Sequence, residues 1–251
     1  MISFFAKPIW YFQRIKSWVF GVHLDGIRVM MYHKIAKNQS NFLTLNVEQF
    51  SNQLQSFVAK GYHFISAKEL LSYLENGTPL PQKPLLLSFD DGYLDNLTLA
   101  YPILKAFNAK AIIFLPTYFI GKTSAWDTPN DATLMTVEQL KSMDNSLIEF
   151  GLHSHQHLNY KQITVAEMEA DIHANLDFFR KNDLPFVPVF AYPFGGRPKI
   201  KAISKQMKTI FTQKGIKMAF RIGNRVNPFS IADQYEIQRF DACGKSFKNL
   251  I

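Results

Sequence analysis

The sequence predicts an α/β protein in which parallel strands close into a (β/α) barrel. Short apolar or β-branched runs alternate with stretches that carry helix start signals along the whole chain, and this alternation implies a parallel sheet. The number of predicted strands and the lack of a glycine-rich nucleotide-binding fingerprint favour a barrel over an open doubly wound sheet. Because such barrels commonly reach about 250 residues without dividing, we expect one barrel domain over residues 26–251 and a separate segment over residues 1–25.

The strands are predicted from short runs of apolar residues. Residues 85–89 are nearly all apolar, which is typical of a strand buried on both faces of a parallel sheet, and the same holds for residues 111–115. Similar runs predict further strands at residues 28–33, 62–66, 147–151, 187–192, 217–221 and 236–240.

Capping signals predict where four helices begin. In a capping box, the residue before the helix and the third helical residue each accept a backbone hydrogen bond from the other. The first helix is expected to end near Lys60, the second at Gly77 and the fourth near Arg180. Residues 78–84 contain three prolines and are expected to form a linker. The four capping pairs are Asn46 with Gln49, Ser66 with Glu69, Thr136 with Gln139, and Thr164 with Glu167.

The charge and cysteine content of the chain limit its partners and its metal chemistry. The net charge is +8 and the isoelectric point is near 9.4, which suits a partner that carries phosphate, such as nucleic acid, an anionic membrane surface or an anionic glycolipid. The single cysteine, Cys243, excludes an internal disulfide and a thiolate zinc cage. A bound metal would therefore need histidine and carboxylate ligands.

The first twenty residues combine aromatic and basic side chains at helical spacing, which predicts an amphipathic helix. This composition favours a helix that lies in a membrane interface, and the alternative is a helix packed on the domain's own core. The segment lacks the apolar run and cleavage site of a secretory signal, and no later stretch approaches the roughly 20 apolar residues of a membrane span. We therefore expect a cytoplasmic protein with peripheral contact to the inner face of the cytoplasmic membrane.

Three separate sequence features each follow a predicted strand. They are Asp90 with Asp91, the histidine-rich residues 153–157, and residues 192–196. In α/β barrels, function lies in the loops after the carboxyl ends of the strands. We therefore expect all three features on one rim of the barrel.

The histidine-rich residues and the aspartate pair together predict a metal site. His153 and His157 can reach one metal from a single turn or loop, and an aspartate would supply a third, anionic ligand. A catalytic zinc site has three such protein ligands and an open position for water. We therefore assign Asp91 as the third metal ligand and Asp90 as the base that takes a proton from the bound water. Taken separately, the aspartates could form a turn and the histidines could be solvated. We expect His155 to point away from the metal.

Four short motifs resemble those of the polysaccharide deacetylases of carbohydrate esterase family 4, which contain the NodB-homology domain. Residues 87–92, Leu-Ser-Phe-Asp-Asp-Gly, resemble the first family motif, and His153-Ser154 with His157 resembles the second. Residues 191–195, Ala-Tyr-Pro-Phe-Gly, resemble the third. Residues 29–33, Val-Met-Met-Tyr-His, resemble the first strand of the poly-N-acetylglucosamine deacetylase subgroup. The resemblance extends from about residue 27 to about residue 240.

The resemblance implies a distorted (β/α) barrel, which we expect to have seven strands. It implies an enzyme that removes acetyl groups from N-acetylated sugars with a divalent metal, usually zinc. Residue by residue, it implies that Asp90 is the base and that the metal ligands are Asp91, His153 and His157. It also implies that the backbone N–H of Tyr192 stabilises the oxyanion of the tetrahedral intermediate.

The sequence departs from the family pattern at the acid that must protonate the leaving amine. The usual late Leu-x-His motif is missing, since no histidine follows His173. The subgroup with the Met-Tyr-His strand implies His33 as this acid, and the alternative is a buried histidine with a structural role. The third motif also lacks its usual arginine, and the later Asp-Trp motif has no counterpart. Arg239 and Asp241 are candidates to orient Asp90, or they form a surface ion pair.

Several residues near the rim are expected to contact the sugar. Aromatic side chains that follow rim strands can stack on a sugar ring, although they are as often packing residues. The predicted substrate contacts are Tyr93, Trp126, Pro193, Phe194 and Arg239.

Two functions from different classes follow from these features. The first is a metal-dependent N-deacetylase that acts on an N-acetylhexosamine in a glycan or glycolipid, and the basic charge favours a lipid-linked sugar or lipopolysaccharide core. The alternative is a glycan-binding protein that keeps the fold without turnover, because the late acid motif is missing. Nucleic acid is not expected as a partner, since the sequence has no recognition motif for it.

Overall fold

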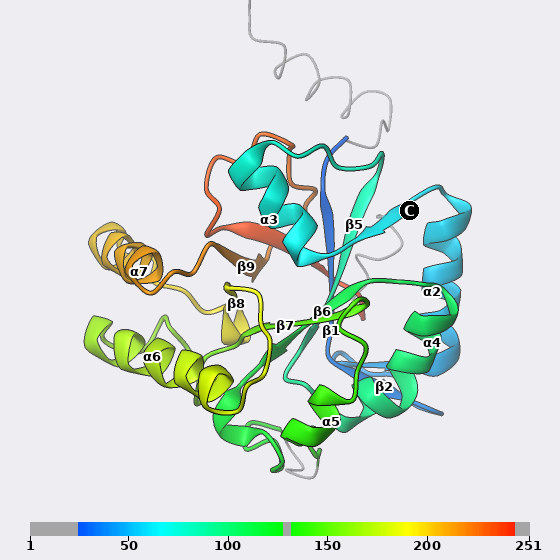
Figure 1. Cartoon of the computed structure of the whole chain (residues 1–251), viewed down its shortest axis with the longest axis horizontal. Coiled ribbons are helices and arrows are strands. Elements are labelled where there is room, and N and C mark those ends of the chain that lie inside the picture. Colours follow the sequence, from blue (N-terminus) through cyan, green and yellow to red (C-terminus); the bar gives the residue numbers. More distant parts are fainter. Residues whose placement is uncertain (1–24, 128–131, 244–251) are drawn as a thin grey trace, which may run out of the picture.

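Seven parallel strands close into a barrel in the computed structural model, which describes residues 25–127 and 132–243 (Figure 1). The strands follow the order β1-β10-β9-β8-β7-β6-β5, and β5 pairs again with β1, which closes the ring. The predicted barrel and its seven strands are thus confirmed, whereas the amphipathic helix predicted for residues 1–20 lies outside the described residues. The strands are β1 (Arg28–Tyr32), β5 (Pro84–Asp90), β6 (Ala111–Leu115), β7 (Ile148–Leu152), β8 (Val189–Ala191), β9 (Met218–Ile222) and β10 (Ile237–Asp241).

Three short strands lie outside the ring. β4 (His63–Ile65) was predicted, and it pairs with the first residues of β5. The later residues of β5 pair with β6 along the same edge. β2 (Lys34–Ala36) and β3 (Thr44–Asn46) form a separate two-stranded parallel sheet directly after His33. β2 and β3 were not predicted, because three residues are too few for a periodic signal.

Side-chain alternation along the strands divides the core into two apolar clusters. Successive residues of a strand point to opposite faces of the sheet. The smaller cluster collects residues of one face together with Ala67 and Leu70, which belong to a helix. The larger cluster collects residues of the other face together with apolar residues of several other helices. Sequence neighbours that fall in different clusters include Val29 and Met30, Leu86 and Leu87, and Ile113 and Phe114.

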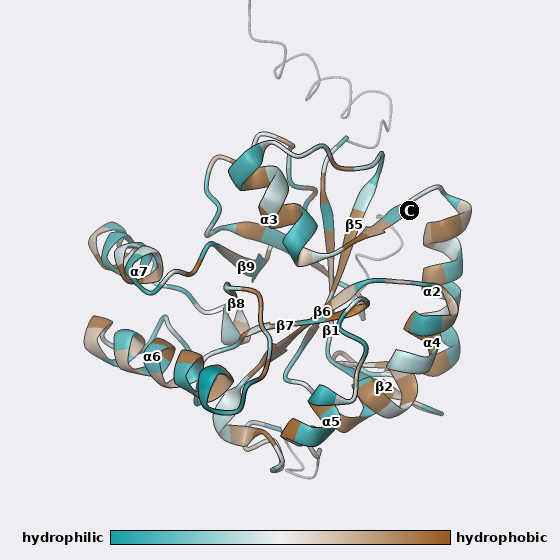
Figure 2. Ribbon diagram, viewed as in Figure 1, coloured by the Kyte–Doolittle hydropathy of each residue, from teal (hydrophilic) through white to brown (hydrophobic). Residues whose placement is uncertain are grey.

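Helices cover the outside of the barrel, and Figure 2 shows hydrophobic and hydrophilic residues on different sides of them. All four predicted capping boxes are formed, and α3 ends as predicted at Gly77, whose φ is 69°. Among the described helices, none combines the length and the apolar character that a membrane span requires. The capped helices are α2 (Val47–Ala59), α3 (Ala67–Asn76), α5 (Val137–Lys141) and α6 (Val165–Lys181).

Other helical segments were not predicted. The π-helical turn η1 (Asn96–Ala100) continues into α4 (Tyr101–Ala106), and α7 (Lys201–Gln213) follows the third motif. Neither α4 nor α7 has a side-chain cap, so the start signal used for the other helices is missing. The apolar residues 203, 207 and 210 recur at helical spacing and could have revealed α7. The short 3-10 turns η2 (Thr117–Phe119) and η3 (Pro193–Gly195) lie after β6 and β8.

Candidate active site

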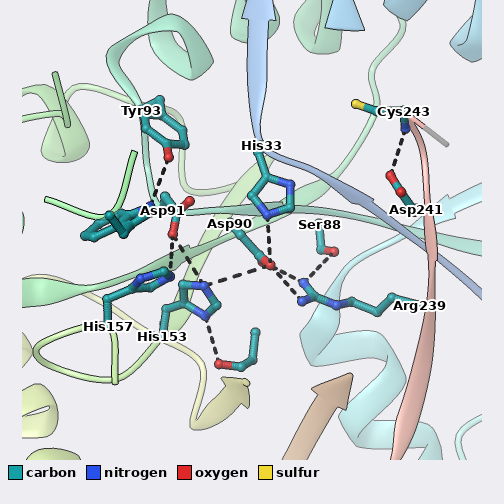
Figure 3. A network of polar contacts seen from close by, with 12 residues as sticks. His33, Ser88, Asp90, Asp91, Tyr93, His153, His157, Arg239, Asp241 and Cys243 are labelled. Carbon is teal, nitrogen blue, oxygen red and sulfur yellow. Dashed lines mark hydrogen bonds and ion pairs between the residues drawn. The ribbon is translucent and has the colours of Figure 1, made fainter. Parts of the chain in front are cut away.

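Four strands bring four of the predicted site residues together at the carboxyl end of the barrel (Figure 3). Asp90 is the last residue of β5, and Arg239 is the middle residue of β10. His33 and His153 each follow directly after the last residue of β1 and β7. These side chains contact one another, so this end of the barrel is polar and buried.

Asp91, His153 and His157 form a cluster that fits a metal ion. All three are buried, and their candidate ligand atoms lie within 4.8 Å of one another. Oδ1 of Asp91 lies 3.1 Å from Nε2 of His157 and 3.4 Å from Nε2 of His153. Two ligands held at about 2.0–2.1 Å by one tetrahedral zinc would be roughly 3.3 Å apart. Oδ1 of Asp91 is buried without a hydrogen-bond donor among the described residues, and a divalent cation would satisfy it.

Unusual backbone conformations support this cluster. The φ angles of Asp91 and His157 are 74° and 55°, in the left-handed region that residues other than glycine rarely adopt. Gly92 has a φ of 71°, and a Cβ atom there would lie 2.6 Å from the side chain of Leu115. The positive φ angle therefore favours glycine at position 92, and a Cβ atom there would also displace the side chain of Leu115. Backbone strain of this kind concentrates at functional sites.

The histidines of the loop after β7 have different neighbours. Nδ1 of His153 donates to the carbonyl of Ala191 at 2.8 Å, which leaves Nε2 for a metal. Nδ1 of His157 is buried and has no hydrogen-bond partner among the described residues. His155 lies outside the cluster, as expected, and its Nδ1 is 2.9 Å from the hydroxyl of Thr117.

A buried carboxylate that the sequence analysis missed organises the same loop. Asp171 of α6 accepts the backbone N–H groups of His155 and Gln156, each at 3.0 Å, and the hydroxyl of Tyr160 at 2.8 Å. These bonds fix the turn that brings the two candidate ligands together. The sequence signal that could have revealed Asp171 is a charged residue on the same face of α6 as the apolar Met168.

A bidentate ion pair orients Asp90 inside the barrel. Nη1 and Nη2 of Arg239 donate to the two carboxylate oxygens at 2.6 and 2.7 Å. Nη1 lies 3.3 Å from the hydroxyl of Ser88, which in turn donates to the carbonyl of Met30 at 2.6 Å. Because Arg239 is 1% exposed, the alternative of a surface ion pair is wrong.

Neighbouring charges keep both aspartates ionised. Burial raises the pKa of Asp90, but Arg239 and His153 outweigh burial and the net pKa is lowered. Burial acts in the same way on Asp91, where His157 and His153 hold the pKa well below its usual range. Burial lowers the pKa of His157, which favours the neutral imidazole that a metal binds. At His153 the aspartate charges overcome burial and raise the pKa.

His33 and His153 both approach the same carboxylate oxygen of Asp90, whereas Arg239 lies on the side of Asp90 away from the metal cluster (Figure 3). Nε2 of His33 is 3.8 Å from Oδ2 of Asp90, and Nε2 of His153 is 3.9 Å from the same oxygen. Asn96 fixes the backbone here by donating to the carbonyl of His33 at 2.8 Å. The imidazole is 16% exposed, so it is in contact with solvent as well as with Asp90.

The oxyanion role predicted for the backbone of Tyr192 is wrong. Its N–H donates to the carbonyl of Phe220 at 3.0 Å, next to the pairing of β8 with β9. Its side chain is buried, and its hydroxyl donates to the carbonyl of Tyr235 at 3.2 Å. An N–H group already bound within the sheet is not available to an oxyanion.

Three further predictions are corrected by burial or by hydrogen-bond partners. Tyr93 is 1% exposed and its hydroxyl donates to Asp127 at 2.9 Å, so its ring cannot stack on a sugar. Arg239 is occupied by the base and buried, so it is not a substrate contact. Asp241 accepts the backbone N–H of Cys243 at 3.0 Å and makes no described contact with the base.

The remaining predicted substrate contacts lie around His157. The ring of Phe194 is 59% exposed and its centroid lies 4.6 Å from that of His157. Trp126 is half-buried and its centroid lies 3.9 Å from that of His157. Pro193 is buried within η3, which contradicts its predicted contact with substrate.

The barrel and its rim define a class of protein: a (β/α) barrel with an Asp-His-His candidate metal centre beside a second, ionised carboxylate. The family model described as polysaccharide deacetylase matches residues 77–219, which include all three motifs after the first strand. The chain belongs to the polysaccharide deacetylase family.

Similar proteins agree with this assignment. The poly-β-1,6-N-acetyl-D-glucosamine N-deacetylase of Staphylococcus epidermidis is 28% identical over 239 residues, which make up 90% of this chain and 76% of that protein. YxkH of Bacillus subtilis is 28% identical over 167 residues, which cover 66% of this chain, and the chain spans 56% of the length of YxkH. The structure of IcaB from Ammonifex degensii shares the fold, with a TM-score of 0.75, 22% identity, and coverage of 91% of this chain and 99% of that one.

Proposed function

We propose that the protein is a metal-dependent N-deacetylase that removes the acetyl group from an N-acetylhexosamine in a glycan or glycolipid. The observation that carries this proposal is the cluster of Asp91, His153 and His157 beside the ionised Asp90, in a barrel of the polysaccharide deacetylase family. Relatives named as N-deacetylases of an N-acetylglucosamine polymer support the same reaction. A divalent metal held by the cluster, for which we propose zinc, would polarise the acetamide carbonyl and acidify water.

In this proposal Asp90 is the general base. Its carboxylate accepts a proton from water as the water oxygen adds to the acetamide carbon. Arg239 holds both carboxylate oxygens, so the base keeps one orientation and remains ionised at neutral pH. The tetrahedral intermediate then collapses by cleavage of the carbon–nitrogen bond, which releases acetate and leaves the sugar amine.

His33 is proposed as the acid that protonates the departing amine. An amine leaves poorly without a proton, and His33 is a partly exposed imidazole that approaches Asp90 from a different strand end than the candidate metal ligands. A substrate between the cluster and His33 would have its carbonyl near the metal ligands and its nitrogen near the imidazole.

Replacing His33 by alanine should lower kcat for an acetamide substrate about 10²–10³-fold, the usual contribution of a general acid. The loss should be small for an activated aryl acetate, because a phenolate leaves without prior protonation. Steady-state kinetics on both substrates measures the difference. His155→Ala, which changes a histidine outside the cluster, serves as the control. Equal losses on both substrates would exclude the acid role.

A basic groove beside the third motif supports a substrate with an anionic carrier, such as a lipid-linked sugar or lipopolysaccharide core. The groove has a volume of about 720 Å³ and begins at Arg197, shortly after η3. Its two carboxylates are already paired, Glu236 with Arg197 and Asp233 with Lys208. Three exposed lysines of the groove form no ion pair with any described carboxylate, so they are available to a phosphate group. These groove lysines are Lys199, Lys201 and Lys205.

Changing the three groove lysines to glutamine should raise KM for an anionic N-acetylated glycolipid about 5–20-fold at low salt, since exposed charge pairs each contribute about 0.2–1 kcal/mol. KM for a neutral N-acetylglucosamine oligomer should stay unchanged. The matched control changes three exposed lysines elsewhere, Lys60, Lys141 and Lys181. If the groove variant keeps the parental KM for the glycolipid, the carrier proposal fails and a neutral polymer becomes the better substrate.

We also propose that the protein works in the cytoplasm in peripheral contact with the inner face of the cytoplasmic membrane. An anionic glycolipid substrate of this kind would be met at a membrane surface, which the net charge of +8 suits. Fractionation of cells that express the full chain and a variant lacking residues 1–20 tests this location. Equal membrane association of the two chains would exclude a role for the N-terminal segment.

A further inference from the structure

The two candidate histidine ligands differ in what holds their rings. A metal-binding histidine almost always donates its second ring N–H to a carboxylate, carbonyl or water, which fixes the ring orientation. His153 does so through the carbonyl of Ala191 at 2.8 Å. Nδ1 of His157 is buried and has no such partner among the described residues. Two aromatic side chains, Trp126 and Phe194, lie against the His157 ring instead.

Aromatic rings take the place of that hydrogen bond. The indole of Trp126 lies against the His157 imidazole with centroids 3.9 Å apart and planes inclined by 31°. Phe194 packs on the same imidazole at 4.6 Å with an inclination of 58°. Of the two, Trp126 is the closer and the more nearly parallel to the imidazole, whereas Phe194 is largely exposed.

Trp126 is itself held in place by a hydrogen-bonded anchor. Its Nε1 donates to the hydroxyl of Tyr93 at 3.2 Å, and that hydroxyl donates to Oδ2 of Asp127 at 2.9 Å. The same oxygen accepts the hydroxyl of Ser124 at 2.7 Å and pairs with Nζ of Lys34 at 2.6 Å. Three donors on one oxygen thus join β2, the loop after β5 and the segment that carries Trp126.

We propose that Trp126 is a positioning residue for the metal ligand His157, and that the Tyr93–Asp127 anchor holds Trp126 in this role. The inference rests on the proposed metal site and adds a determinant of metal affinity from outside the three ligands. It also changes the role of Trp126, which the sequence suggests as a platform for the sugar. A sugar platform would affect KM, whereas a positioning residue affects the affinity for the metal.

The test is the affinity of the full chain for Zn²⁺, measured by competition with a chromophoric chelator. Trp126→Leu should weaken Zn²⁺ binding about 10–100-fold, the usual effect of changing a neighbour that orients a ligand. Trp126→Phe, which keeps an aromatic face, should recover most of the affinity. Tyr93→Phe removes only the anchoring hydroxyl, without a change of charge, and should weaken binding a few-fold in the same direction.

Several outcomes would overturn the proposal. Parental Zn²⁺ affinity in Trp126→Leu with a raised KM would identify a sugar platform instead. Equal weakening of Zn²⁺ binding in the leucine and phenylalanine variants would mean that aromatic stacking does not position His157. Unchanged affinity in Tyr93→Phe would mean that the Tyr93–Asp127 anchor does not hold Trp126 in this role. A parental protein that binds no Zn²⁺ would instead refute the proposed metal site, so the two failures are distinguishable. Thermal unfolding of each metal-free variant checks that the fold is retained.

Discussion

Replacing Asp90 by asparagine is expected to lower kcat for deacetylation about 10³-fold, within the range of a lost general base. Metal content should remain that of the parental protein, because the candidate ligand atoms belong to Asp91 and the two histidines. The amide keeps the size of the carboxylate but cannot accept the proton of water at neutral pH. Release of acetate and elemental analysis of the same samples measure both quantities.

The adjacent residue provides the matched comparison. Asp91→Asn should lose both metal and activity, since Oδ1 of Asp91 lies 3.1 and 3.4 Å from the ligand atoms of the two histidines. Comparing the two asparagine variants thus distinguishes the role of a base from the role of a metal ligand. Full activity in Asp90→Asn, or loss of metal from Asp90→Asn but not from Asp91→Asn, would contradict the assignment.

The second large effect is expected at Arg239. Changing it to methionine leaves Asp90 buried without its ion-pair partner, and this should lower the free energy of unfolding by about 3–5 kcal/mol at neutral pH. Urea unfolding of the metal-free proteins measures the loss. Arg239→Lys keeps the charge but not the bidentate geometry, so its loss should be smaller.

The same variant should change the pH dependence of stability and activity. Arg239 lowers the pKa of Asp90 against the effect of burial, so the stabilisation by the pair is present above the unfolded pKa and disappears as pH falls through the lower folded pKa. The stability difference between the parental protein and Arg239→Met should therefore shrink in acid. Without Arg239, burial raises the pKa of Asp90, and the acid limb of the kcat profile should move to higher pH. An unmoved acid limb would show that another group titrates there.

Local signals in the sequence predict most of the fold. Four capping boxes mark the helices that begin with them, and the apolar runs of residues 85–89 and 111–115 are strands whose residues are all buried. Both kinds of signal depend on neighbouring residues only. α7 and the turn η1 were missed because neither begins with a side-chain cap.

The sequence predicts the site residues that directly follow strand ends. It does not predict the contacts and burial that depend on which segments pair across the barrel. Asp90, Asp91 and the loop histidines are found from their positions after strands. The partner of the Tyr192 N–H depends on the neighbouring strand, and the burial of Tyr93 depends on the segment that carries Asp127. Neither is encoded by a local motif. Arg239 was suggested as a partner of Asp90, but its burial follows only from closure of the barrel.

We propose that the buried Asp-His-His cluster and Asp90 together remove acetyl groups from an N-acetylated sugar. Mass spectrometry of N-acetylglucosamine oligomers and of an N-acetylated glycolipid pool, before and after incubation with zinc-loaded protein, tests it most directly. We predict that acetyl groups are lost from at least one of these substrates, and that the loss stops on addition of a chelator and in Asp90→Asn. Protein that holds one zinc per chain yet leaves every N-acetylated substrate unchanged would contradict the account and favour a glycan-binding protein with the same fold.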